Sequence, residues 1–199
     1  MNKPQDYDTT KEFTSFTPLE PGGYICKIVQ VQETTSKNGN PMLKIGLDIA
    51  EGPNKGFYTE MFKNDTRADK KWGCVVNQLV YDSNGGNTTN RGFKTFITCV
   101  ENSNKGFNVA WGDKFCDCFK GKLIGGAFGR EQYLGNDGNL HWSTKCRWFR
   151  SVDEIRAGIP VPDDKLYEGS APQASAAAVP PPFDPNAYEE VIPDSSLPF

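Results

Sequence analysis

The sequence predicts a mainly β domain with a helical insert, followed by a C-terminal tail of low complexity. Three observations support this prediction. Runs in which apolar and polar residues alternate are separated by short turns rich in glycine and asparagine. In the middle of the chain the apolar residues recur every three or four positions instead. After residue 165 the chain becomes rich in alanine and proline.

The first 63 residues predict three strands. Residues 24–34 alternate for part of their length, and residues 43–49 place their aliphatic side chains on one face and Lys44 on the other. Asn38-Gly39 lies between these two runs and is a strong hairpin signal. A second turn leads into a third predicted strand over residues 57–63.

The helical insert is predicted from a change of period. Residues 68–81 carry apolar side chains at helical spacing, and Asp65 or Thr66 can cap a helix that starts there. A second helix is predicted over residues 92–102 on the same spacing. A short helical turn is predicted over residues 113–119.

Two further strands are predicted over residues 121–134 and 139–150, joined by a Gly-Asn-Asp-Gly turn. Ser151 and Glu154 form the pattern of a capping box, which predicts a short helix after the last strand. Three strands, helices between strands 3 and 4, and a closing hairpin match the strand count of the five-stranded OB barrel. The sequence therefore predicts an OB-like barrel over residues 1–165.

The net charge of the chain changes sign at residue 165, where its composition also changes. Residues 1–165 hold all 22 basic residues and 20 of the 25 acidic ones, a net charge of +2. Residues 166–199 hold five acids and no base, a net charge of −5. A basic body with an acidic tail is the asymmetry expected of a nucleic-acid-binding protein whose tail has another role. The composition of the tail predicts that it is disordered.

The sequence also predicts where the protein resides. No apolar run approaches the roughly 20 residues of a membrane span. The first eight residues have no apolar stretch of the signal-peptide type. We therefore expect a cytoplasmic protein with no membrane partner, and six cysteines that remain reduced thiols.

The tip of the tail, residues 192–199, combines acidic residues with a terminal Leu-Pro-Phe. It resembles the tip of bacterial single-stranded DNA-binding proteins, which ends in Asp-Ile-Pro-Phe or a similar sequence, although this chain has fewer acids and Leu before the Pro. The resemblance implies that the Phe ring and the terminal carboxylate dock in a pocket of replication or recombination enzymes. The residues concerned are Asp194, Leu197, Pro198 and Phe199. The alternative is an untethered polar terminus without a partner.

A second resemblance covers about 150 residues of the body. Residues 39–45, 100–107 and 119–125 occur in the same order as similar segments of phage-encoded single-stranded DNA-binding proteins. This resemblance implies a role in phage DNA replication and recombination, in the cytoplasm of the host cell.

The closing hairpin is the predicted DNA-binding surface, because it combines cations for phosphates with aromatic rings for bases. Strict alternation places Lys145, Arg147 and Phe149 on its open face, and Trp142 and Trp148 on the core face. The preceding strand and its end add Lys122, Phe128, Arg130 and Tyr133. The alternative is a solvated face whose rings pack beneath the helical insert.

Five other cations are candidates for the same surface. Lys44 lies on the polar face of the second strand, which forms part of the binding face in OB folds. Lys63, Arg67, Lys70 and Lys71 cluster where the third predicted strand meets the first predicted helix. An ordinary charged helix start is an equally good interpretation of that cluster.

No pattern indicates catalysis, a metal or a cofactor. Cys116-x-Cys118 is the only close pair of cysteines, and its spacing is shorter than that of structural zinc sites. His141 is the single histidine, and no P-loop, G-x-S-x-G or H-E-x-x-H motif occurs. We therefore expect a binding protein and not an enzyme.

The sequence as a whole predicts a protein that binds single-stranded DNA without sequence preference. Its tail recruits partner enzymes and competes with DNA for the basic surface. Two alternatives stay open. One is an annealing protein or accessory factor of recombination, which would form ring-like oligomers. The other is a protein-interaction module without nucleic acid. The sequence leaves oligomeric state, DNA over RNA preference and site size undetermined.

Overall fold

The computed structural model describes residues 3–5, 7–9, 17–82 and 88–169. The chain divides into one compact unit over residues 1–167 and a second over residues 168–199. Of the second unit only residues 168 and 169 are described. The predicted disorder of the tail, and the tip residues Asp194, Leu197, Pro198 and Phe199, therefore lie outside the described residues.

The body is built on one antiparallel sheet of five strands in the order β3-β2-β1-β4-β5. The strands are β1 Gly22–Thr35, β2 Pro41–Ile49, β3 Val75–Leu79, β4 Leu123–Leu134 and β5 Leu140–Arg150. The helices are α1 Phe57–Asn64, α2 Arg91–Ser103, the 3₁₀ turn η1 Asp117–Phe119 and α3 Val152–Ala157. The mainly β class and the number of strands are confirmed, but β3 is not the segment that was predicted as the third strand. The sheet is open, because β3 and β5 are its two edges and form no ladder with each other in the described part of the chain.

The predicted hairpin of β1 and β2 is confirmed. In its turn the Ser36 N–H donates a hydrogen bond to the Asn40 carbonyl, with 2.8 Å between nitrogen and oxygen. Gly39 in the same turn has φ 79°. That φ lies in the left-handed region, where glycine has no steric penalty. The pleat of β2 then buries Leu43 and Leu47 and leaves Lys44 exposed.

The strand predicted over residues 57–63 is wrong, because this segment forms α1. The N-cap of α1 is Gly56, which offers no side-chain oxygen. Asp48 on β2 supplies the acceptor instead: one carboxylate oxygen accepts from the backbone N–H of Tyr58 at 3.0 Å, and the other accepts from the Thr59 hydroxyl. These contacts satisfy donors in the first helical turn that would otherwise have no partner.

The helix predicted over residues 68–81 is also wrong, because its C-terminal part is β3 in antiparallel register with β2. Two contacts hold the chain extended before the strand. The Trp72 indole N–H donates to the Leu47 carbonyl at 2.7 Å. A Cβ on Gly73 would lie 1.8 Å from the Met61 methyl, so the backbone passes close to α1 here and any larger residue would have to displace the end of the Met61 side chain. The helical spacing of the apolar residues here is coincidental, and Val75 is exposed.

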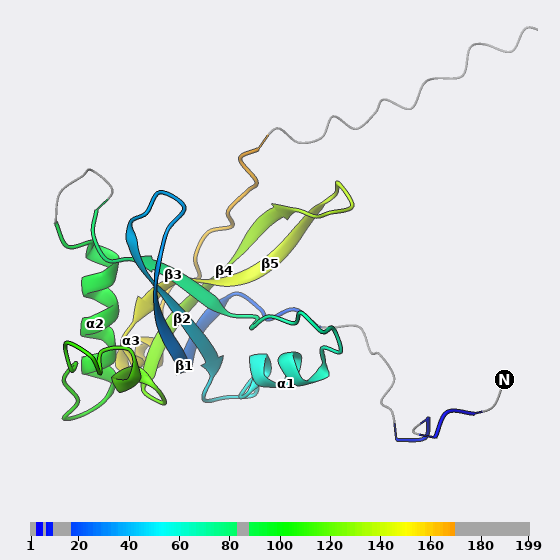
Figure 1. Ribbon diagram of the computed structural model, residues 1–199, viewed down its shortest axis with the longest axis horizontal. Coiled ribbons are helices and arrows are strands. Elements are labelled where there is room, and N and C mark those ends of the chain that lie inside the picture. Colours follow the sequence, from blue (N-terminus) through cyan, green and yellow to red (C-terminus); the bar gives the residue numbers. More distant parts are fainter. Residues whose placement is uncertain (1–2, 6, 10–16, 83–87, 170–199) are drawn as a thin grey trace, which may run out of the picture. The chain divides into compact units, whose positions relative to one another are not determined.

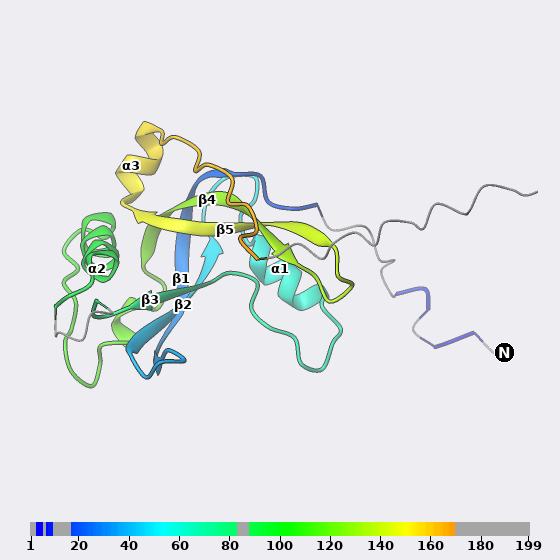
Figure 2. The same cartoon turned by 90° about the horizontal axis from the view of Figure 1, so that it is seen from above.

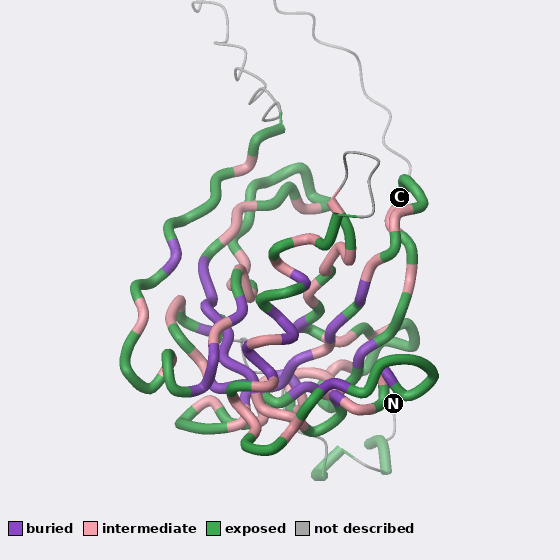
Figure 3. The backbone as a smooth tube through the Cα atoms, turned by 90° about the vertical axis from the view of Figure 1, so that its left-hand side faces the viewer, coloured by how far each residue is buried: buried purple, intermediate pink, exposed green. Residues whose placement is uncertain are grey.

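The remaining predicted elements are confirmed. The Asn90 side chain caps α2, and the capping box of Ser151 and Glu154 begins α3. Phe96 on α2 packs 5.1 Å from both Phe119 and Phe149, measured between ring centroids. Figures 1 and 2 show α2 and α3 at one end of the sheet and α1 at the other. Figure 3 shows the buried residues gathered where the strands cross.

Replacing Asp48 should test the role of this carboxylate in the fold. We expect Asp48→Ala to lower the free energy of unfolding by about 3 kcal/mol, because it leaves buried donors of the first turn of α1 without an acceptor. Thr59→Ala removes only one donor to the same carboxylate and should cost about 1 kcal/mol. Urea denaturation measures both. Equal effects of the two variants would contradict this account.

Candidate nucleic-acid interface

The two edges of the sheet face each other across a groove, which we call the β3–β5 seam. It is defined by residues 74–78 on one side and 144–150 on the other. Two adjoining hollows of about 260 and 270 Å³ form it, and both are lined by Val76, Asn77, Cys146 and Arg147. The strands come together at Cys74, whose thiol is hydrogen-bonded by the backbone of Cys146.

A β-bulge in β5 decides which side chains face the seam. Phe128 pairs with Cys146 and Ala127 pairs with Trp148, so that Arg147 is an extra residue on β5. A bulge of this kind reverses the in-and-out alternation beyond it. Trp148 is consequently 48% exposed and lines the seam.

The predicted stacking role of Phe128 and Phe149 is therefore wrong. Phe128 is fully buried, with its ring edge-on to Tyr24 at 5.3 Å between centroids. Phe149 is buried against Phe96. The core position predicted for Trp148 is wrong for the same reason, since the bulge turns it outward.

Three bases of β5 line the seam, opposed by one acid. Lys145 lies 3.3 Å from the Glu131 carboxylate, and Arg150 donates to the Phe149 carbonyl at 3.2 Å. Partial burial disfavours ionisation of Glu131, but the hydrogen bonds from Lys145 and Lys165 outweigh it and lower the pKa of that carboxyl.

Among these three bases, Arg147 has a buried nitrogen that lacks a hydrogen-bond partner within the described part of the chain. Its Nη1 atom is buried and has no hydrogen-bond partner among the described residues. A buried donor without an acceptor costs free energy, and a charged donor costs more than a neutral one. An anionic oxygen entering the seam would remove that cost with a charge-assisted hydrogen bond.

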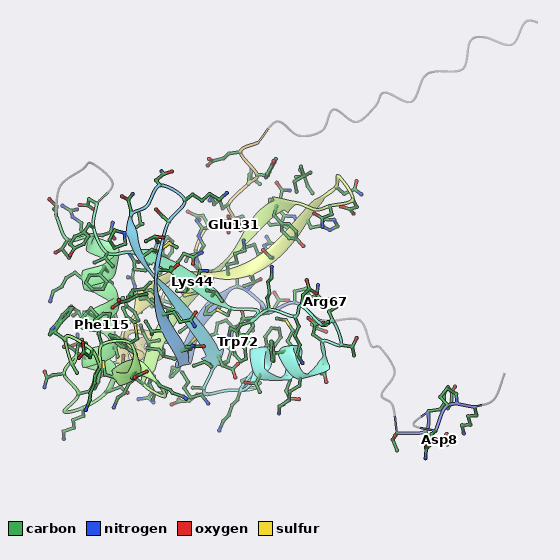
Figure 4. The ribbon with its side chains drawn as sticks, in the orientation of Figure 1. Asp8, Lys44, Arg67, Trp72, Phe115 and Glu131 are labelled. Carbon is green, nitrogen blue, oxygen red and sulfur yellow. The ribbon has the colours of Figure 1, made fainter. Side chains whose placement is uncertain are left out.

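Lys44 extends this charge onto the neighbouring strand. It pairs with Asn77, a residue of both hollows, and directly opposed residues of a ladder point to the same face. Within the described part of the chain Lys44 forms no ion pair shorter than 4.0 Å. Figure 4 shows it on β2.

The predicted cluster around α1 lies outside the seam, and three of its members have local contacts. Lys63 pairs with Glu60 at 2.9 Å, and Lys70 sits 4.6 Å above the Phe62 ring. Arg67 pairs with Asp65, and its hydrogen bonds lower the pKa of that carboxyl to about 2. Figure 4 shows Arg67 beside the α1 end of the molecule. The fourth member, Lys71, is exposed.

The remaining candidates are spread along the hairpin of β4 and β5. Arg130 pairs with Asp164 and lies 5.2 Å from the centroid of the Trp142 ring. Trp142 is 42% exposed, so its predicted core position is wrong. Tyr133 is exposed near the turn. Lys122 lies at the other end of β4, 4.5 Å above the Phe107 ring, and is not part of the seam.

The six thiols lie in the core of the body or pack against it. The described residues contain no group of three or more His, Cys, Asp or Glu side chains that could hold a metal ion. Burial raises the pKa of Cys74 to about 12 and that of Cys99 to about 11. Such thiols remain protonated and act as small apolar side chains.

Comparison with protein-family models finds a match to part of the chain. Residues 5–79 match the model of a family described as a protein of unknown function, DUF669. The matched segment ends with β3 and contains none of β4 or β5. No curated protein matches the chain. In the described residues, no helix has the length and apolar character needed to cross a membrane.

The structure thus brings together Lys44, Lys145 and Arg147 from the predicted set, and adds Trp148 and Asn77. Asn77 was missed because its segment was predicted to be a helix. Trp148 was missed because a bulge in β5 depends on the pairing with β4, and the sequence of β5 itself contains no glycine that would indicate one.

The Cys74 thiol at the closed end of the seam gives a pH prediction. Its usual pKa of 9.0 rises to about 12 in the folded protein, so its contribution to stability is full below pH 9 and is lost as the pH rises toward 12. The stability difference between wild type and Cys74→Ala should shrink by about 1 kcal/mol between pH 8 and pH 10. Denaturation at both pH values measures it, and a constant difference would contradict the assignment.

Proposed function

We propose that the protein binds single-stranded nucleic acid, DNA in the first instance, along the β3–β5 seam. The five-stranded sheet is, in this proposal, a partly open barrel of the OB type, with β3 and β5 as the pair that would close it. The observation that carries the proposal is the seam itself, in which Lys145 and the unpartnered Nη1 of Arg147 lie beside the exposed Trp148.

Sequence-tolerant binding of a single strand needs cations for the phosphates and an exposed ring for the bases. Arg147 and Lys145 supply the cations on β5, and Lys44 adds one on β2, opposite the seam residue Asn77. Trp148 supplies the ring, and Tyr133 adds a second exposed ring on the same face of the hairpin, whereas Trp142 pairs with Gln132 and points to the opposite face. Every base has a face that stacks, so this arrangement binds without reading sequence.

The biological role follows from the resemblance to phage-encoded single-strand binders. We place the protein in DNA replication and recombination as a binding protein without a reaction of its own. The tip of the tail recruits the enzymes that work on the bound strand. An annealing activity would add ring-like oligomers and faster strand pairing to the same DNA binding.

Two variants test the seam directly. Fluorescence anisotropy with labelled oligo-dT should show about tenfold weaker binding for Trp148→Ala, because one base loses its stacking partner. Arg147→Gln should weaken binding and lower the slope of log affinity against log salt by about one, because one phosphate contact is lost.

The control is Lys105→Gln, which removes one exposed positive charge beyond the C-terminal end of α2. It should leave both quantities close to wild type. Equal losses for all three variants would show that binding depends on overall charge and not on the seam. If the wild-type protein does not bind oligo-dT at low salt, the proposal of nucleic-acid binding is refuted.

The tail gives an independent prediction. It carries five acids and no base, so it competes with phosphates for the basic seam. Deleting residues 192–199 should leave DNA affinity equal or raise it at low salt, and the difference should fade as salt screens the charges. Anisotropy at 20 mM and 200 mM salt measures this, and clearly weaker binding by the truncated protein would refute competition.

A further inference from the structure

Another hollow of the body, of about 890 Å³, shares no lining residue with the β3–β5 seam. It lies between the end of β1, the start of β2, the residues after β3 and the turn at residues 111–116. We call it the aromatic groove, after Tyr81, Phe93, Trp111 and Phe115 in its lining. Figure 4 shows Phe115 at the α2 end of the molecule, away from Arg67 and Trp72.

The aromatic groove presents an open ring face. Trp111 is 67% exposed, although it stacks on Phe115 with 5.2 Å between centroids and 19° between ring planes. Phe93 braces both rings at 6.4 Å. Stacking covers one face of the indole and leaves the other for a ligand. Such a face attracts a cation through the quadrupole of the ring.

The charge of the aromatic groove is opposite to that of the seam. Its lining contains Glu33 and Asp113 but no Lys, Arg or His. Neither carboxylate has an ion-pair partner within 4.0 Å among the described residues. The rest of the body is basic, so these two acids stand out against the overall charge.

The turn that carries Trp111 is held in place against β1. The Phe115 N–H donates to the Gly112 carbonyl at 2.9 Å. The backbone of Glu33 is hydrogen-bonded to the Cys116 thiol, which ties the turn to β1. These contacts, with the stacking of Trp111 on Phe115, hold the backbone of the turn against β1, and a site whose backbone is ordered before binding has a lower entropic cost.

We propose that the aromatic groove docks a segment of a partner protein in which an arginine or lysine stands next to an apolar side chain. The cation lies over the free face of Trp111 between Glu33 and Asp113, and the apolar neighbour enters the groove beside Phe93. Nucleic acid does not fit, because its phosphates would face two carboxylates. The acidic tail of this chain does not fit for the same reason.

The test uses three peptides that differ only in the central residue: Ac-Leu-Arg-Leu-NH₂, Ac-Leu-Gln-Leu-NH₂ and Ac-Leu-Glu-Leu-NH₂. Each is titrated into the ¹⁵N-labelled full chain. The readout is the indole N–H resonance of Trp111, assigned with Trp111→Phe. We expect the arginine peptide to shift this resonance and to bind about tenfold tighter than the glutamine peptide, with the glutamate peptide weakest.

The acids are tested with the double variant Glu33→Gln, Asp113→Asn, which should reduce the preference for arginine over glutamine to about twofold or less. Its matched control is Asp69→Asn, Asp163→Asn, which changes the net charge equally at exposed positions outside the groove and should keep the preference. Oligo-dT binding by the groove variant should stay at the level of this control, which separates the groove from the seam.

Three outcomes would overturn the proposal. The first is no shift of the Trp111 resonance with any peptide at millimolar concentration. The second is equal binding of the three peptides, which would show that the groove binds the leucine side chains and does not recognise the cation. The third is a shift with spermidine as large as with the arginine peptide, which would indicate a site for small free cations. Peptide docking in the aromatic groove does not require nucleic-acid binding at the seam, so each is tested independently of the other.

Discussion

One extra residue in β5 determines the surface of this protein more than any other feature. The bulge at Arg147 turns Phe149 inward, where it packs on Phe96 of α2, and turns Trp148 outward into the β3–β5 seam. Without it, strict alternation would leave Phe149 in solvent and put the indole in the core. Arg147, the extra residue of the bulge, has a buried guanidinium nitrogen that finds no hydrogen-bond partner among the described residues. The core and the candidate binding surface therefore depend on one local irregularity, as is common for bulges beside functional sites.

The other side of the seam, formed by β3, depends on the hydrogen bonds of the Asp48 carboxylate. Asp48 accepts hydrogen bonds from the first turn of α1 and so fixes a helix at the end of β2. The chain then passes Met61 of α1 at Gly73 and reaches Cys74 just before β3, where the thiol is hydrogen-bonded by the backbone of Cys146 on β5. A buried carboxylate is costly unless its acceptors are satisfied, and here three donors satisfy it. This contact places β3 on the edge of the sheet, and the seam follows from that placement.

The body carries two concave surfaces of opposite charge. The seam combines lysine and arginine with a tryptophan, and the aromatic groove combines two carboxylates with a tryptophan. Stacking rings give both surfaces apolar area, so charge is what separates their ligands. In the two proposals, a phosphate backbone is attracted to the seam and repelled by the aromatic groove, and the reverse holds for a basic protein segment. Such a division would allow one small domain to hold two kinds of partner at once.

The sequence by itself determined the elements whose signals are local. The Asn-Gly turn, the alternation in β2, the apolar spacing of α2 and the cap of α3 each act within a few residues, and all were predicted correctly. Lys44, Lys145 and Arg147 were also identified from the residues alone. Tertiary structure decided the rest, because the deciding partners are distant in the chain. Residues 57–64 are helical because Asp48 caps them, residues 75–79 are extended because β2 offers an edge, and β5 exposes Trp148 because its register with β4 slips by one residue. No local pattern contains those pairings, so the cations of the site could be predicted and its aromatic side could not.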